Sequence, residues 1–256
     1  MLLLAGVISF TTSCHKTVNP TALGTFWFHL HTDIDTNEVG DTAKQYRDAS
    51  GRHFSLSVAQ FYISNVRLHN VDGSTYTIAN ACILKDIDSE QYVIGQAPAG
   101  IYDDVTFAAG LSGSYDSDAP AAFSTTGYIP NTTMWFGGSA GYIDMKLQGF
   151  ADTTTAQNGT SLVPFSYELD MEAYTNGIGS SPNYQVAMPA RGSAAYPVYQ
   201  LLAGGVTYIH IICDYGKLLS VIDFKTMDSA NTNTGLNLAT AATIAHNVPN
   251  LFRYEE

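Results

Sequence analysis

The chain has 256 residues, of which 45% are apolar and only 13% charged, about half the usual charged share of soluble proteins. Aromatic residues make up 12%, which excludes a disordered chain because so many rings need a core to bury them. The formal net charge is −12, and an acidic surface repels nucleic-acid phosphates and anionic membranes. We therefore expect one packed domain that has no nucleic-acid partner.

The chain begins with an apolar leader. Met1–Phe10 (MLLLAGVISF) is too short to span a bilayer as a mature helix, and small residues then precede Cys14. This segment resembles a bacterial lipoprotein signal, in which the cysteine becomes the lipidated N-terminus. We expect a signal peptide over residues 1–14, a tether over 15–24 and one domain over 25–256. The mature protein would be lipid-anchored in the bacterial cell envelope, facing the periplasm or at the outer-membrane surface, and would touch the membrane only through this anchor. A buried N-terminal strand is the alternative.

Strand patterns dominate the rest of the chain, beginning with residues 25–35 (TFWFHLHTDID). Phenylalanine and leucine occupy one face of this run, and the other face carries Trp27, His29, His31 and Asp33. An Asp72-Gly73 turn predicts a hairpin. Further strand-like runs follow at short spacing: Phe61–His69, Thr75–Ile78, Ala81–Asp86, Gly100–Ala109, Gly141–Gln148, Ser161–Asp170 and Gly205–Cys213.

Helical patterns are few, and the best candidates are two short segments near the C-terminus. These are Lys217–Met227 and Leu238–Ala245, the second with Asn237 in position to cap it. Many short strands separated by turns are typical of sandwiches and barrels. We expect an all-β fold, an antiparallel β-sandwich of immunoglobulin-like or Greek-key type, with one or two short helices.

The strongest chemical pattern is Trp27-x-His29-x-His31-x-Asp33. On a strand these side chains share one face, with Cα atoms of alternate residues about 6.8 Å apart. Two imidazoles at that spacing can converge on copper, zinc or nickel. Two ligands fall short of a complete site, so His210 is the first candidate for a third ligand and Asp33 the second. A solvated strand face, with His210 as a core residue, is the plainer alternative.

Other motifs match known sites only in part. Asp33-x-Asp35-x-Asn37 begins like a calcium loop, but Glu38 stands where an EF-hand needs glycine, so a polar turn is favoured over calcium. Gly137–Gly141 matches the Gly-x-Ser-x-Gly elbow around Ser139, yet a strand follows it where a hydrolase needs a helix. Two acidic pairs fit solvated turns and strand ends better than glycoside chemistry: Asp103/Asp104 and Asp86/Asp88.

The cysteines beyond the leader are Cys82 and Cys213, both in strand-like runs. Export to an oxidising compartment would permit a disulfide between them. Two buried free thiols are equally ordinary.

A series of motifs runs through most of residues 25–252. In chain order they are Tyr46, Gly51, Phe54 and Ser55; Gln60–Leu68 (QFYISNVRL); Leu84–Asp86; Pro98–Tyr102; Phe107 and Gly110; Met134-Trp135; Gly141–Gly149; and Ala242–Asn247 with Phe252. In this order they resemble the MbnP family of copper-binding proteins of bacterial envelopes. The chain differs from the family's usual pattern at Phe136 and Gly137, where a second tryptophan is common, and at Glu168, where a histidine is common.

The resemblance implies a β-sandwich and, in some members, copper held by histidine near a tryptophan-derived residue. A haem-containing partner enzyme oxidises that tryptophan to kynurenine, and Trp27 and Trp135 are the tryptophans that could be modified or shield the metal. We expect an exported, lipid-anchored protein that binds or sequesters copper without catalysing a reaction. A metal-free module recognising a protein or glycan is the alternative, and a hydrolase using Ser139 is the third reading.

Overall fold

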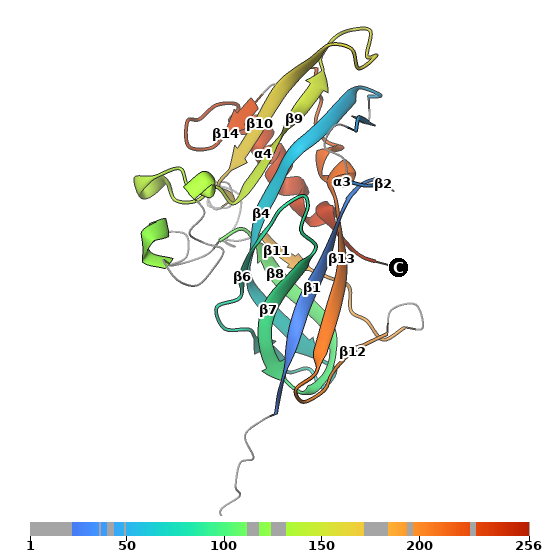
Figure 1. The fold of residues 1–256 in the computed structure, drawn as a ribbon, viewed down its shortest axis with the longest axis vertical. Coiled ribbons are helices and arrows are strands. Elements are labelled where there is room, and N and C mark those ends of the chain that lie inside the picture. The colour runs from blue at the N-terminus through green and yellow to red at the C-terminus, as the bar shows by residue number, and fades with distance from the viewer. Residues whose placement is uncertain are drawn as a thin grey trace, which may run out of the picture.

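The computed structural model describes residues 22–35, 37–39, 44–48, 50–111, 118–123, 132–171, 184–193, 197–225 and 229–255. The predicted leader, with Cys14, lies outside these residues. The described strands form a five-stranded and a ten-stranded sheet (Figure 1). No helix of the described chain is long and apolar enough to cross a membrane.

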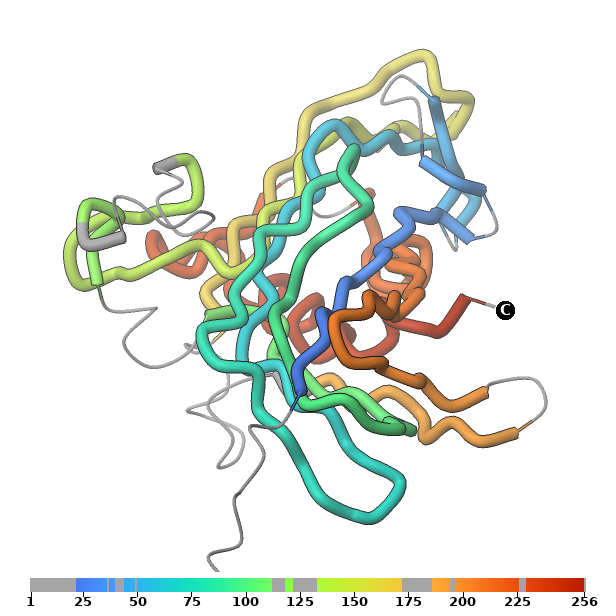
Figure 2. Tube along the Cα trace, turned by 60° about the horizontal axis from the view of Figure 1, so that its bottom comes forward, coloured from blue at the N-terminus to red at the C-terminus, as the bar shows by residue number. Residues whose placement is uncertain are grey.

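The five-stranded sheet is built from strands near both ends of the chain. Its order is β15-β13-β1-β2, with β7 paired to the other part of β1. Figure 2 shows β1, in blue, and β13, in orange, running next to each other although most of the chain separates them. The strands are β1 (Leu23–Ile34), β2 (Asn37–Glu38), β7 (Gln91–Pro98), β13 (Val206–Asp214) and β15 (Phe252–Tyr254).

The ten-stranded sheet is centred on the long strand β4, which pairs with β8 on one side and β9 on the other. Its strands are β3 (Tyr46–Arg47), β4 (His53–Asn70), β5 (Thr75–Thr77), β6 (Cys82–Lys85), β8 (Gly100–Ala109), β9 (Met145–Asp152), β10 (Leu162–Leu169), β11 (Tyr184–Ala187), β12 (Tyr199–Leu201) and β14 (Ser229–Asn231). The helices are α3 (Tyr215–Leu219) and α4 (Leu238–Asn247), with 3-10 turns η1 (Pro120–Phe123), η2 (Thr132–Met134), η3 (Gly138–Ala140) and η4 (Val248–Leu251).

Aromatic side chains fill the space between the two sheets. Phe28 of β1 meets Phe107 of β8 at a centroid distance of 5.6 Å. Phe252 of β15 meets both Phe107 at 5.1 Å and Phe61 of β4 at 5.6 Å. These rings are buried, so the inward residues of β1 join the sheets and its outward residues remain available for other contacts.

The all-β prediction is confirmed, but the sheets are mixed and not purely antiparallel. β1 and β13 are parallel, as are β10 and β14. Alternation in the sequence tells which side chains share a face and says nothing about the direction of the partner strand. The predicted Asp72-Gly73 hairpin is present between β4 and β5, with Gly73 at φ 85°.

The two predicted helices differ in outcome. α4 matches its prediction, although Asn237 makes no side-chain cap and adopts a left-handed conformation at φ 50°. α3 is much shorter than Lys217–Met227. Asp214 caps its start by accepting the N–H of Lys217, and the helix ends after Leu219. The polar and β-branched residues that follow are weak helix formers.

Cys82 and Cys213 are free thiols, so of the two alternatives that the sequence left open the structure has the free pair and not the disulfide. Cys213 is fully buried in the core between the sheets. Cys82 packs against a separate cluster that contains Tyr62, Met134 and Tyr142. The two cysteines therefore belong to different packing clusters, and burial raises the pKa of each thiol to about 12.

Candidate metal centre

The pairing of β1 with β13 brings three histidines onto one outward face of the five-stranded sheet. In this parallel pair His29 lies opposite His210, and His31 follows His29 on the same face of β1. The ring centroids of His29 and His31 are 4.2 Å apart, and those of His29 and His210 are 4.8 Å apart. The structure thus brings together the three histidines that the sequence singled out.

Two carboxylates that are distant in the sequence lie beside these rings. Glu255 follows β15, and its backbone N–H donates to the carbonyl of His210 at 3.3 Å. Its Oε2 lies 3.0 Å from His210 Nδ1 and 3.4 Å from His31 Nε2. Glu90 precedes β7, and its carbonyl accepts the backbone N–H of Leu30 at 2.8 Å. That bond fixes Glu90 against β1 between the two histidines.

Glu90 orients the two rings of β1. Its Oε2 lies 3.2 Å from His29 Nε2, and its Oε1 lies 3.3 Å from His31 Nδ1. An ionised carboxylate only accepts hydrogen bonds, so this geometry favours a hydrogen on each of these two nitrogens. In neutral rings the lone pairs then lie on His29 Nδ1 and His31 Nε2, on the side of His210 and Glu255. A carboxylate behind a ligating imidazole is the usual outer partner of such a ligand.

The spacing of the four inner groups fits one small transition-metal ion. His29, His31, His210 and Glu255 each offer a ligand atom, and these atoms lie within 4.8 Å of one another. His29 Nδ1 and His210 Nδ1 are 3.0 Å apart. An ion with bonds of about 2.0–2.1 Å holds tetrahedral ligands roughly 3.4 Å apart. His31 Nε2 is buried and has no hydrogen-bond partner. An ion at this position would bind the lone pair of this nitrogen.

A buried lysine holds the turn that carries Glu90. Lys85 is fully buried, and its Nζ donates to Thr32 Oγ1 at 2.7 Å, to the Ser89 carbonyl at 2.9 Å and to the Asp86 carbonyl. Burial lowers the pKa of this amine from its ordinary value. The lysine thereby ties β1, next to His31, to the residue just before Glu90.

Asp33, the alternative third ligand, is placed elsewhere. It is 9% exposed, and its Oδ2 lies 3.3 Å from the guanidinium of Arg253. Burial raises its pKa, with Asp214 adding to the shift and Arg253 opposing it. Asp33 belongs to neither group of metal-ligating side chains found among the described residues. The register explains this, because Asp33 lies beyond His31 where β1 pairs with β2.

The two tryptophans lie in different surroundings. Trp27 is half-buried on the histidine face of β1, with its ring 5.8 Å from that of Tyr208. Trp135 packs 4.5 Å from Tyr142 in the cluster that also contains Tyr62. Trp27 is therefore the tryptophan that the fold sets beside the histidines.

The remaining sequence motifs form no comparable group within the described residues. Ser139 is exposed on the 3-10 turn η3, where a nucleophile elbow would require a strand followed by a helix. Asp86 accepts the backbone N–H groups of Asp88 and Ser89, so it stabilises a turn. Asp35 lies in a turn at φ 58° and does not join Asp33 in a ligand group.

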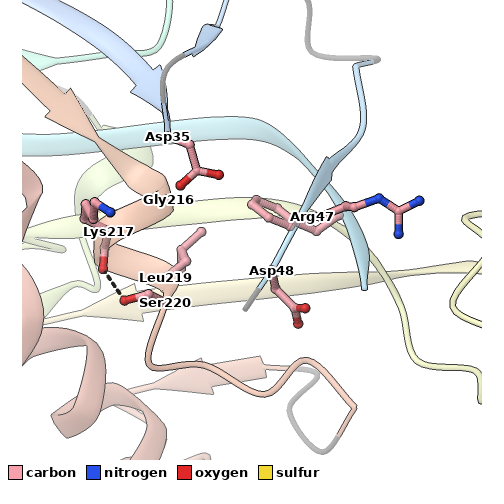
Figure 3. Close-up of a pocket in the computed structure, with 8 residues that line it drawn as sticks. Asp35, Arg47, Asp48, Gly216, Lys217, Leu219 and Ser220 are labelled. Carbon is pink, nitrogen blue, oxygen red and sulfur yellow. Dashed lines mark hydrogen bonds between the residues drawn. The ribbon is translucent and has the colours of Figure 1, made fainter. Parts of the chain in front are cut away.

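A small surface pocket lies near the end of β1. It has a volume of about 140 Å³ and is lined by Asp35, Arg47, Asp48 and Lys217, with Phe54 and Leu219 among its apolar contacts (Figure 3). Pockets for organic ligands are usually about 300 Å³ or larger. Its lining contains both signs of charge and no histidine, so the histidine group is the better candidate for metal chemistry.

Sequence reasoning missed Glu90 and Glu255. Neither lies in a motif, and each reaches the histidines through a strand pairing that local periodicity does not encode. Glu90 comes just before β7, a strand that the sequence analysis did not identify although its burial alternates. In the sequence, the apolar run Tyr92–Ile94 shortly after Glu90 was the available signal for a strand.

Comparison with known proteins shows which protein family the chain belongs to. The family model MbnP matches residues 24–237. The chain belongs to the MbnP family. This confirms the resemblance drawn from the sequence motifs.

A solved structure agrees at the level of the fold. MbnP from Methylosinus trichosporium matches with a TM-score of 0.53 at 12% identity, covering 82% of each chain. At this low sequence identity, the match shows only that the two proteins share a fold. No curated protein matches the chain significantly.

Proposed function

We propose that this MbnP-family protein binds copper at His29, His31, His210 and Glu255. The observation that carries the proposal is the convergence of three imidazoles and one carboxylate at ligand spacing around His31 Nε2, a buried nitrogen that makes no hydrogen bond. Each of these side chains comes from a strand or from the residue after one, so the rigid sheet presets their positions.

The ligand types favour copper(II). Imidazole suits copper, zinc and nickel, and among divalent ions copper binds such nitrogen and oxygen sites most strongly. The group contains no cysteine, the thiolate ligand that would favour copper(I). Membership of the family that the sequence motifs linked to copper supports the same ion.

The protein's role in this proposal is binding or sequestration, without catalysis. The family resemblance also implies a haem-containing partner that oxidises a tryptophan. Trp27 meets this expectation better than Trp135, because it lies two residues before His29 on the same face. The expected export and lipid anchor at Cys14 would place the copper site in the cell envelope.

The test is a copper(II) titration of the metal-free protein. Wild type should bind copper with high affinity, and a His29→Ala/His31→Ala double variant should lose this binding while keeping its fold by circular dichroism. His246→Ala is the matched control, because His246 is exposed on α4 and its removal lowers the histidine count without touching the group.

Equal copper binding by wild type and the double variant would place the site elsewhere. Absence of copper binding by wild type at neutral pH would contradict the proposal, and would favour a metal-free module recognising a protein or glycan.

A further inference from the structure

His31 stands between two carboxylates, with one ring nitrogen turned toward each. Its Nε2 faces Glu255 Oε2 at 3.4 Å, and its Nδ1 faces Glu90 Oε1 at 3.3 Å. The proposed copper group uses only the Nε2 side of this ring. His31 also belongs to a second group with Glu38 and Glu90, whose ligand atoms lie within 4.8 Å of one another. Glu90 approaches the His31 ring from its Nδ1 side.

Strand pairing explains how Glu38 reaches this position. β2 turns back antiparallel along the end of β1, and Glu38 pairs with Asp33. Residues paired in this way point to the same face, so Glu38 becomes the diagonal neighbour of His31. Glu38 is exposed and has no cationic partner among the ion pairs of the described residues, whereas Asp33 has Arg253.

We propose a second divalent-cation site formed by His31 Nδ1, Glu38 and Glu90 Oε1, joined to the copper site through the shared His31 ring. The inference rests on the proposed function, because the first ion occupies the Nε2 side. Glu90 serves both sites with different oxygens, since its Oε2 continues to accept the N–H of His29. The second ion displaces the hydrogen of His31 Nδ1, which passes to solvent.

The ligand set defines the class of ion. One imidazole and two carboxylates suit copper(II) or zinc, with the remaining positions open to water. The second group has one imidazole where the copper group has three, so it fills after the copper group. A bridging imidazole places its two ions about 6 Å apart, from bonds of roughly 2.0 Å on either side of the ring.

The experiment loads the metal-free protein with copper(II) and measures both bound metal and the electron paramagnetic resonance signal. In wild type, the first copper should give a full signal. The second should raise the bound metal to two ions per chain and weaken the signal per copper, because a bridging imidazole couples the two spins. Glu38→Gln should bind one copper per chain with an undiminished signal.

Asp35→Asn is the matched control for the loss of one negative charge. Asp35 is exposed, lies close to Glu38 in sequence and belongs to neither ligand group. Its φ of 58° is one that asparagine adopts readily, so the variant should fold and bind two coupled ions.

The outcomes separate the two proposals. Wild type saturating at one copper would overturn the second site and leave the first. Two ions in Glu38→Gln, still coupled, would also overturn it. Absence of copper from wild type would overturn the proposed function itself.

Discussion

At the scale of single residues, the direction of each ring nitrogen matters more than the number of histidines. Glu90 lies within 3.3 Å of a nitrogen on both His29 and His31, and so favours tautomers that turn the lone pair of His29 toward His210 and that of His31 toward Glu255. Glu255 then adds a carboxylate where those lone pairs meet. The result is a set of ligands oriented before the ion arrives, which lowers the ordering cost of binding.

Trp27 gives this geometry an optical readout. It lies two residues before His29 on the same strand face, with Cα atoms about 6.8 Å apart. Copper(II) bound at the histidines should therefore quench most of the Trp27 emission. Each tryptophan can be observed alone, because the chain has only two.

In Trp135→Phe the remaining Trp27 emission should fall by more than half on adding copper(II), and in Trp27→Phe the remaining Trp135 emission should change little. Zinc, which does not quench, is the ion control. Strong quenching confined to Trp135 would move the metal site away from β1.

At the scale of elements, the metal centre depends on how the turn between β6 and β7 is held. Lys85 closes β6 and reaches into that turn with three hydrogen bonds, one to Thr32 of β1 and two to turn carbonyls. A buried amine satisfied in this way stabilises a specific arrangement of the backbone. The turn held in this way ends at Glu90. Lys85 therefore affects the metal centre indirectly, by fixing the position of Glu90.

Lys85→Met should lower the free energy of unfolding by about 1–3 kcal/mol, because it leaves buried oxygen acceptors unpaired. It should also weaken copper binding by roughly 10–100-fold through loss of the Glu90 position. Urea unfolding and copper titration measure the two effects.

Lys225→Met, at an exposed lysine, is the control and should change neither quantity. Loss of stability with unchanged copper affinity would show that the turn does not position Glu90.

At the scale of the whole molecule, the metal centre joins segments near the two ends of the described chain. β1 begins the described chain, and Glu255 lies at its end, beside His210 of β13. The ligands converge only in the folded chain, so an ion that binds them stabilises the fold by mass action. The net charge of −12 also favours the approach of cations over anions.

The apolar run Met1–Phe10 ahead of Cys14 is the sequence feature on which the proposed membrane anchor rests. Replacing Cys14 with Ala should remove the site of lipidation and shift the protein from the membrane fraction to the soluble fraction of its bacterial host. Fractionation followed by intact-mass measurement tests this. A wild-type protein that is soluble and carries no lipid mass would contradict the anchor.

The sequence by itself determined that strands dominate the fold, and it predicted the hairpin at Asp72-Gly73 and helix α4, because these follow from local periodicity and turn chemistry. It also determined that His29 and His31 share a face, since alternation along a strand requires it. The ordered motifs were enough to identify the MbnP family.

Only the tertiary structure decided which partners those histidines meet. The parallel pairing of β1 with β13 set His210 opposite His29, and the contacts of β7 and β15 added Glu90 and Glu255. The tertiary structure also pairs Asp33 with Arg253, and it places Cys82 and Cys213 in different packing clusters. These outcomes depend on pairings between segments far apart in the chain, and strand periodicity carries no information about them.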